Sequence, residues 1–164
     1  MKGNTGSSTN SNPKTAGAEA AKKAKAGLDS VNMAYVYASC AYDLDAMLAG
    51  IAEELPGVPV IGNTSFTGVI TPEGFVTGDD GFVGIMAVSD PEMAVGIAAV
   101  EKSGCPVDAG EQAAKLAMER AGKTAAPDYF YMVAPPGEEE FYLKGITKVI
   151  GRVPFYGGSA ADNS

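Results

Sequence analysis

The chain contains no histidine and only two cysteines among its 164 residues. Without histidine it lacks the commonest general base, the Ser-His and Cys-His nucleophile pairs and the usual zinc ligand, so most enzyme classes are disfavoured. Cys40 and Cys105 have no metal-ligand spacing and are too few for a disulfide framework, which indicates a reducing, cytoplasmic setting. We therefore expect no catalytic residue, no metal and no cofactor.

Long apolar runs and basic residues are also scarce. No stretch is long enough to cross a bilayer, and Met1-Lys2 leads into polar residues rather than a signal peptide. Five lysines against Glu19 give the first 27 residues a charge of +4, which leaves −12 on the remainder of a net −8. An acidic body argues against nucleic acid and anionic membranes as partners.

One passage of the chain occurs twice. Residues 50–62 are matched without a gap by residues 145–157, at a constant offset of 95, and the apolar runs 34–38 and 129–133 keep the same offset. Each copy predicts a strand, a helix and a second strand. Segments 34–65 and 129–160 should therefore form two βαβ units with parallel strands and equal loop lengths, joined within one duplicated domain.

The remaining patterns predict helices and strands around these units. Asn12 or Ser11 and Pro13 begin a helix that runs to about Ala26, and Asp43 caps the next one. Strands are expected at 31–38, 58–61, 128–133 and 153–156, a hairpin at 69–76, and an antiparallel pair at 82–88 and 94–100. Two further helices follow a capping box at Asp108 and Glu111 and the run Glu138-Glu139-Glu140. The expected inward-facing residues are Leu44, Met47, Leu48, Ile51 and Leu55 in one helix, Ala113, Leu116, Ala117 and Ala121 in the next, and Leu143, Ile146 and Ile150 in the last.

These elements predict an α/β fold with a mixed β-sheet flanked by helices, containing two duplicated βαβ units and an antiparallel hairpin. Residues 1–12 are so rich in Ser, Thr, Asn and Gly that composition alone predicts a disordered tail or an expression scar. The chain stops at Ser164, soon after a predicted strand, so we expect a single domain over 1–164 that is truncated at its C-terminal end. An unpaired edge on strand 153–156 would then favour self-association.

Glycine and hydroxyl residues follow the second strand of each βαβ unit. Open α/β sheets place ligands beyond the carboxyl ends of their strands, and free backbone N–H groups there can hold a carboxylate or phosphate. The glycines also have a purely structural explanation, since they permit tight turns and close packing. The predicted ligand-binding residues are Gly62, Asn63, Thr64 and Ser65 in the first copy, and Gly157, Gly158 and Ser159 in the second.

Three motifs in this order resemble a known family. They are Ser8-Thr9-Asn10 ahead of Ala16-Gly17, Val60 through Ser65 ahead of the Ile70-to-Phe75 hairpin, and Pro154 through Gly157-Gly158-Ser159-Ala160-Ala161-Asp162. Together they resemble the N-terminal FIST domain, named for F-box and intracellular signal transduction proteins, over nearly the whole chain. The resemblance implies that residues 1–12 are a native first strand running into a Ser/Thr loop.

The resemblance also implies a function, namely a cytoplasmic sensory domain that binds a small ligand, an amino acid or other small carboxylate. Its expected partners are signalling outputs: a chemotaxis receptor, a histidine kinase or a cyclic-dinucleotide enzyme. Two alternatives stay open. One is a hydrolase- or transferase-type enzyme with Ser159 or Cys40 as nucleophile, although no nucleophile elbow or Walker loop is present. The other is a protein-interaction module with no small ligand.

Overall fold

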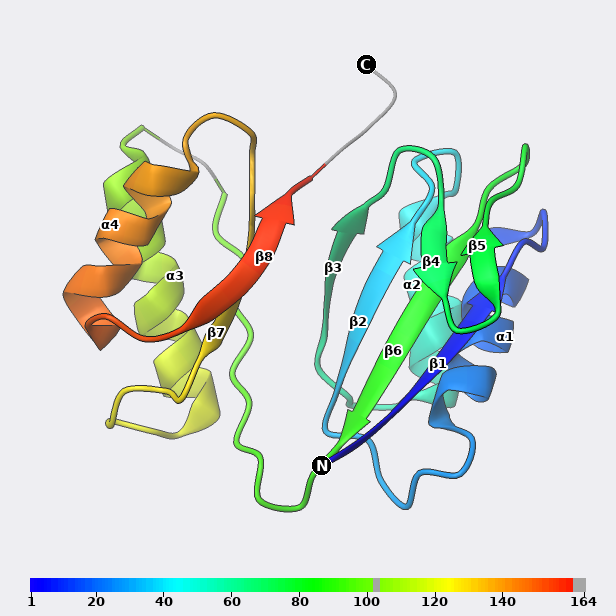
Figure 1. The fold of residues 1–164 in the computed structure, drawn as a ribbon, viewed down its shortest axis with the longest axis horizontal. Coiled ribbons are helices and arrows are strands. Elements are labelled where there is room, and N and C mark those ends of the chain that lie inside the picture. Colours follow the sequence, from blue (N-terminus) through cyan, green and yellow to red (C-terminus); the bar gives the residue numbers. More distant parts are fainter. Residues whose placement is uncertain (102–103, 161–164) are drawn as a thin grey trace. The chain divides into compact units, whose positions relative to one another are not determined.

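Eight strands and four helices make up residues 1–101 and 104–160, the part of the chain that the computed structural model describes. The chain divides into two units, residues 1–93 and 94–160 (Figure 1). Its main sheet contains parallel and antiparallel pairs, so the predicted α/β class with a mixed sheet is confirmed. The assignment of residues 1–164 to a single domain stays a prediction.

The first unit is built on a four-stranded sheet with the order β1-β6-β2-β3. Central strand β6 runs antiparallel to both β1 and β2, whereas β2 and β3 are parallel. The elements of this unit are β1 (Lys2–Ser8), α1 (Pro13–Lys25), β2 (Met33–Ala38), α2 (Leu44–Glu54), β3 (Val60–Thr64), β4 (Val69–Thr71), β5 (Gly74–Val76) and β6 (Val83–Ser89).

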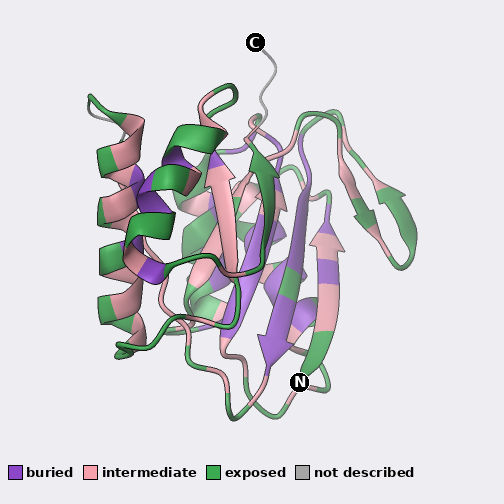
Figure 2. Cartoon of the chain, turned by 60° about the vertical axis from the view of Figure 1, so that its left-hand side comes forward, coloured by how far each residue is buried: buried purple, intermediate pink, exposed green. Residues whose placement is uncertain are grey.

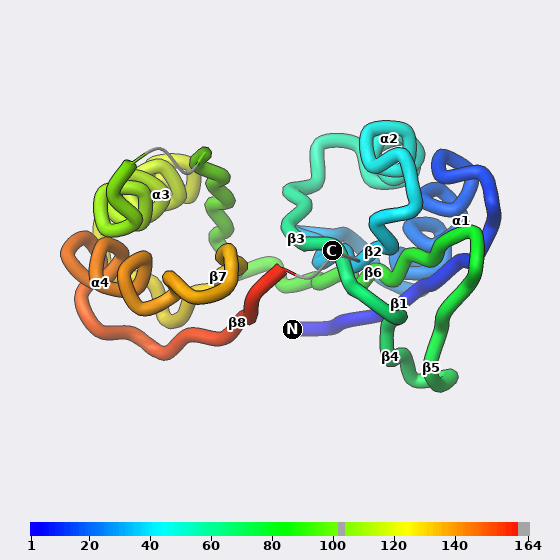
Figure 3. Tube along the Cα trace, turned by 90° about the horizontal axis from the view of Figure 1, so that it is seen from above, coloured from blue at the N-terminus to red at the C-terminus, as the bar shows by residue number. Residues whose placement is uncertain are grey.

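The sheet of the first unit lies between two layers. Seen from above, α2 lies on one side of it and the β4–β5 hairpin on the other (Figure 3). The core forms on the helix side, where the four alanines of α1, Ala16, Ala20, Ala21 and Ala24, are fully buried. Buried residues follow β2 and β6 along most of their length (Figure 2). Small side chains on α1 let its backbone approach the sheet closely.

The second unit consists of a helix pair and a two-stranded parallel sheet. Its elements are α3 (Pro106–Ala121), β7 (Phe130–Ala134), α4 (Glu139–Ile150) and β8 (Phe155–Ser159). Ala114, Ile146 and Ile150 form a buried cluster in this unit, with Phe130 and Met132 packed against them. Among the described residues, this cluster has three buried members, against fourteen in the core cluster of the first unit.

Both predicted βαβ segments form a strand, a helix and a parallel strand, as expected from the sequence. The prediction that the two units have equal loop lengths is wrong by one residue. Ala38 pairs with Thr64 in the first unit and Ala134 with Ser159 in the second, so the offset is 96 for the first strand and 95 for the last. The difference lies ahead of the helix, where residues 39–43 correspond to the shorter loop 135–138.

The two helix pairs also make matching contacts. In the first unit, Gly50 of α2 packs on the Lys14 carbonyl of α1 so closely that an added Cβ would overlap it. In the second, Gly145 of α4 meets the Val107 carbonyl of α3 in the same way. Helix α3 has 16 residues and α1 has 13, and both begin with a proline.

Several sequence expectations for single elements are confirmed. Asn12 caps α1 through a hydrogen bond from the Thr15 N–H, and Asp43 caps α2 through the Ala46 N–H. Strands β4 and β5 pair as the predicted hairpin. The first residues of the chain are not a tail, because all seven residues of β1 pair with β6. The disordered tail predicted from composition is therefore wrong, and the first strand implied by the family resemblance is confirmed.

Other expectations were wrong. Residues 94–100 form no strand, and β6 pairs with β1 and β2 instead. Asp108 lies in the first turn of α3, which begins two residues earlier behind the N-cap residue Cys105, so it forms no capping box with Glu111. Met47 and Ile51 of α2 are buried, as is its C-cap residue Leu55, but Leu44 and Leu48 are exposed on the outer side of the helix.

Candidate functional site

Three parallel strand ends meet at one edge of the first sheet. Strand β1 opposes β6, β6 opposes β2, and β2 runs with β3, so β1, β2 and β3 all end at the same edge. Helices α1 and α2 begin at this edge, directly after the loops that leave β1 and β2. This is where open α/β sheets bind ligands.

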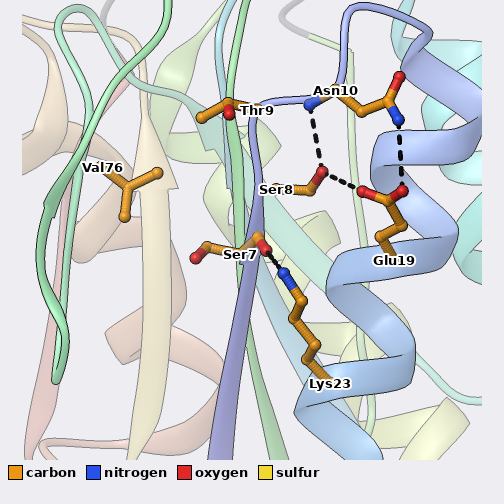
Figure 4. Close-up of a pocket in the computed structure, with 7 residues that line it drawn as sticks. All are labelled: Ser7, Ser8, Thr9, Asn10, Glu19, Lys23 and Val76. Atoms are coloured by element: carbon orange, nitrogen blue, oxygen red, sulfur yellow. Dashed lines mark hydrogen bonds between the residues drawn. The ribbon is translucent and has the colours of Figure 1, made fainter.

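A polar pocket of about 400 Å³ opens at the end of β1 (Figure 4). It lies between the β1 end, one face of α1 and the β4–β5 hairpin. Hydroxyl and amide groups line it together with one acidic and one basic side chain, and the residues are Ser7, Ser8, Thr9, Asn10, Glu19, Lys23 and Val76.

The side chain of Glu19 organises one wall of this pocket. The Ser8 hydroxyl donates to Glu19 Oε2 at 2.6 Å, and Asn10 Nδ2 donates to Oε1 at 3.2 Å. The backbone N–H of Asn10 in turn donates to Ser8 Oγ at 3.2 Å. These bonds fix the loop after β1 against the second turn of α1 (Figure 4).

The charges in the pocket are of both signs. The pKa of Glu19 is lowered, chiefly by the hydrogen bond from Ser8; desolvation opposes this, and the Asn10 amide and the nearby Lys23 ammonium lower the pKa further. Glu19 is therefore ionised at neutral pH. Lys23 lies one turn further along α1, and its ammonium donates to the Ser7 carbonyl at 2.8 Å. A carboxylate and an ammonium thus line the same small volume.

A buried tyrosine forms a hydrogen bond with the loop after β1, which lines the pocket. Tyr42, in the loop between β2 and α2, donates its hydroxyl to the Asn10 carbonyl at 2.6 Å. Burial raises the pKa of Tyr42, and the nearby carboxylates of Asp80 and Glu19 raise it further. The neutral phenol is thereby kept as a hydrogen-bond donor to the loop.

The predicted site residues of the first copy lie elsewhere on the same edge. Gly62, Asn63 and Thr64 belong to β3, paired with Val36, Tyr37 and Ala38, instead of forming a turn after it. Ser65 follows the strand, and its hydroxyl donates to the Gly68 carbonyl at 2.6 Å. An added Cβ at Gly62 would overlap the Val36 carbonyl, which gives this glycine a structural role. None of the four lines the pocket.

The predicted residues of the second copy also lie within a strand. Gly157, Gly158 and Ser159 belong to β8, so the expected turn is wrong here too. The Ser159 hydroxyl donates to Glu139 Oε1 at 2.5 Å, and this bond lowers the pKa of Glu139. An ionised carboxylate beside Ser159 is unfavourable for a second carboxylate there. That Gly62 to Ser65 and Gly157 to Ser159 form one pocket stays a prediction, because they belong to different units.

Sequence reasoning did not select Glu19 and Lys23 as site residues. The spacing of four between them places both on one face of α1, but that face is a site only because β1 ends beside it. The motif Ser8-Thr9-Asn10 is a signal of this site in the sequence, but by itself it indicates only the family resemblance.

Within residues 1–101 and 104–160, no cluster of acidic, Cys or His residues could hold a metal ion. The surroundings of the candidate nucleophiles Ser159 and Cys40 give little support to the alternative that the protein is an enzyme. Cys40 is half-buried and Cys105 exposed, both as free thiols. The carboxylate on the Ser159 hydroxyl has a lowered pKa, which makes it a weak general base.

The FIST N domain family matches residues 32–164, which is most of the chain. The chain belongs to the FIST N domain family. This family is a sensory one in signal transduction. The match begins just ahead of β2, so β1, α1 and most of the polar pocket lie before the matched residues. Of the third family motif, Ala161 and Asp162 lie outside the described residues. Comparison with curated proteins found no match.

Proposed function

We propose that this FIST N domain protein is a cytoplasmic sensory module that binds a free amino acid in the polar pocket at the end of β1. One observation supports the proposal most directly: the carboxylate of Glu19 and the ammonium of Lys23 line one pocket of about 400 Å³. A zwitterionic amino acid carries an ammonium group and a carboxylate close together, so the first can pair with Glu19 and the second with Lys23. A volume of this order suits a small polar molecule.

Both charged groups have hydrogen-bonding capacity left for a ligand. Lys23 uses one of its three ammonium donors on the Ser7 carbonyl, so the others can reach a ligand carboxylate. Each Glu19 oxygen accepts one bond from Ser8 or Asn10, and a carboxylate oxygen can accept a second from a ligand ammonium. The exposed Thr9 hydroxyl and the Val76 side chain are left to contact the ligand side chain.

Signalling would follow from a shift in population. The pocket touches three elements, β1, α1 and the β4–β5 hairpin, so a bound ligand stabilises the arrangement in which all three meet around it. An output that contacts the hairpin would sense that arrangement. The candidate partners are a chemotaxis receptor, a histidine kinase or a cyclic-dinucleotide enzyme.

The test is a thermal-shift screen with the twenty amino acids, small carboxylates and small amines, followed by calorimetric titration of each hit. Glu19→Gln and Lys23→Met should each weaken amino-acid binding by roughly 10- to 150-fold, the range for losing a charged hydrogen bond. Lys22→Met is the matched control, because Lys22 is exposed on the same helix but does not line the pocket.

Variants at the strand ends separate this proposal from binding at the predicted glycine residues. An added Cβ at Gly158 meets nothing within 4 Å, so Gly158→Val should fold normally. Binding that survives Gly158→Val and Ser159→Ala but fails in the Glu19 and Lys23 variants supports the pocket. The reverse pattern would place the ligand at the strand ends. No shift with any compound would favour a protein-interaction module without a small ligand.

A further inference from the structure

Segment 94–100 contacts α3 in the second unit as β1 contacts α1 in the first. Gly6 of β1 lies so close to α1 that an added Cβ would overlap the Ala20 carbonyl, and Gly96 lies equally close to the Ala117 carbonyl of α3. These contacts align β1 with segment 94–100 at an offset of 90, from Gly6 to Gly96, and this part of the two helices at an offset of 97, from Ala20 to Ala117. The second unit therefore offers an internal comparison for the residues around the polar pocket.

The basic residue of the pocket has a counterpart in the second unit. Lys23 donates to the Ser7 carbonyl at 2.8 Å, and Arg120, at the offset of 97, donates to the Ile97 carbonyl at 2.6 Å. In both units a cation on the helix thus covers a carbonyl oxygen of the neighbouring segment. A contact that occurs in both copies belongs to the packing of this segment on its helix, so it does not by itself indicate a ligand.

The acidic residue and its two hydrogen-bond donors have no such counterpart. In the first unit Ser8 and Asn10 both donate to Glu19. Apolar residues stand at the corresponding positions of the second unit, at the same offsets, and all of them are half-buried: Ala98, Val100 and Leu116. Apolar side chains therefore satisfy the packing at these positions, and the fold does not require the carboxylate or its donors.

The Glu19 carboxylate is fixed in direction but open to solvent. Ser8 and Asn10 each bond one of its oxygens, and the residue is exposed. Each oxygen has a lone pair left that an ammonium donor can reach. Because the protein already orders this carboxylate, less side-chain freedom is lost when a ligand binds to it.

A second carboxylate makes the surroundings of the pocket more negative. The Tyr42 hydroxyl donates to the Asn10 carbonyl at 2.6 Å. Burial raises the pKa of Tyr42, and the carboxylates of Asp80 and Glu19 raise it further, so both act at the loop that lines the pocket. Lys23 is the one basic residue among the described lining residues, and its ammonium already contacts a carbonyl. Two negative charges against one positive charge favour a cationic group in the ligand.

We propose that the pocket at the end of β1 recognises an ammonium group through Glu19, so that its ligands are primary amines, with amino acids as the members that also bond Lys23. The inference rests on the proposed function, because it concerns the same pocket. A primary ammonium has three donors and can bond both Glu19 oxygens together. The carboxylate of an amino acid strengthens binding through Lys23 but is not required.

Three related compounds separate the two charged groups of an amino acid. Serine carries both, ethanolamine lacks the carboxylate, and glycerate has a hydroxyl in place of the ammonium. Each is titrated into the whole chain, with the amide NMR signals of residues 7–10 as the readout. Ethanolamine should bind roughly 10- to 150-fold more weakly than serine, since it loses the charged bond to Lys23. Glycerate should bind about tenfold more weakly again, or not at all, because Glu19 repels its carboxylate.

The second unit suggests the variant for the acidic residue. Glu19→Leu introduces the residue that the second unit has at this position, so it should fold normally, as checked by its Tm. It should weaken binding of both serine and ethanolamine by roughly 10- to 150-fold. Lys23→Met should weaken serine binding in the same range, but its effect on ethanolamine should be about tenfold smaller, because ethanolamine has no carboxylate to bond Lys23. Lys22→Met controls for the loss of a charge on α1 outside the pocket.

Two results would overturn this proposal and leave the proposed function intact. The first is glycerate binding as tight as that of serine, and the second is ethanolamine binding that is unaffected by Glu19→Leu while serine binding is weakened. Failure of all three compounds and of every amino acid in the screen would reject the pocket itself and the proposed function with it. If Glu19→Leu fails to fold, Glu19→Gln provides the same comparison.

Discussion

Two buried tyrosines, one in each unit, differ in the hydrogen bonding of their hydroxyl groups. Tyr42 donates to the Asn10 carbonyl, whereas the buried Tyr142 hydroxyl has no hydrogen-bond partner among the described residues. We expect Tyr42→Phe to lower the free energy of unfolding by about 1 kcal/mol, and Tyr142→Phe to leave it unchanged or raise it by about 1 kcal/mol. Urea unfolding of the two variants measures this difference, and equal losses would contradict it.

Glu19 accepts a hydrogen bond from the Ser8 hydroxyl. Because the Ser8 hydroxyl lowers its pKa in the folded chain, the contribution of this contact to stability is present above the unfolded pKa and lost as the pH falls through the folded one. Ser8→Ala should raise the pKa of Glu19 toward its ordinary value, as measured by carbon NMR of the side-chain carboxyl group.

Ser7→Ala provides the control for that titration. The Ser7 hydroxyl donates to no described group in this network, and only its carbonyl contacts Lys23. The pKa of Glu19 should therefore be the same as in the parent chain. A change as large as that in Ser8→Ala would show that a general effect of the loop, and not the Ser8 hydroxyl, sets the pKa.

At the scale of elements, the contact between paired helices is set by glycine. Replacing glycine by alanine inside a helix usually stabilises it by roughly 0.5–1 kcal/mol. Gly50→Ala should instead destabilise the chain by about 1–3 kcal/mol, because the new Cβ overlaps the Lys14 carbonyl and forces α1 and α2 apart. Denaturant unfolding tests this, with Ala49→Gly at an exposed position of α2 as the control. A stabilised Gly50→Ala would refute the close packing.

Local signals in the sequence predicted the elements that depend on neighbours along the chain. The Asn12-Pro13 start of α1, the β4–β5 hairpin and the two βαβ units are of this kind. Elements that depend on a distant partner were not predictable in the same way. The polar residues of β1 become a strand because β6 pairs with them, and the apolar segment 94–100 does not because no described strand does.

In the candidate site too, local sequence signals predicted some features, whereas others depend on distant parts of the chain. Ser8-Thr9-Asn10 was visible as a motif, but its meeting with Glu19 and Lys23 depends on how β1 lies along α1. The glycine positions were recognised, yet their placement inside β3 and β8 depends on strand register. Register is fixed by packing across the sheet and not by the local sequence.

At the scale of the whole molecule, the two units should differ in local stability. The core cluster of the first unit joins buried residues of α1, α2, β2 and β6, whereas the described cluster between the helices of the second unit has three buried members. We expect backbone amides of β2 and β6 to exchange with solvent more slowly than those of β7 and β8, by tenfold or more. Native-state hydrogen exchange measures this. Equal protection of β7 and β2 would contradict it.

The packing of α1 and α3 predicts how this chain tolerates insertions. Both helices keep the same contacts with their partner helix, at Lys14 and Val107, but the contacts with β1 and with segment 94–100 lie four residues further along α3. Four residues are close to one full turn, so the longer helix presents the same face at both ends. Insertions of about one turn should therefore be neutral in these helices, while insertions of one or two residues rotate the packed face away from the sheet. The helices can lengthen during evolution, or in a designed fusion, only in steps of a turn.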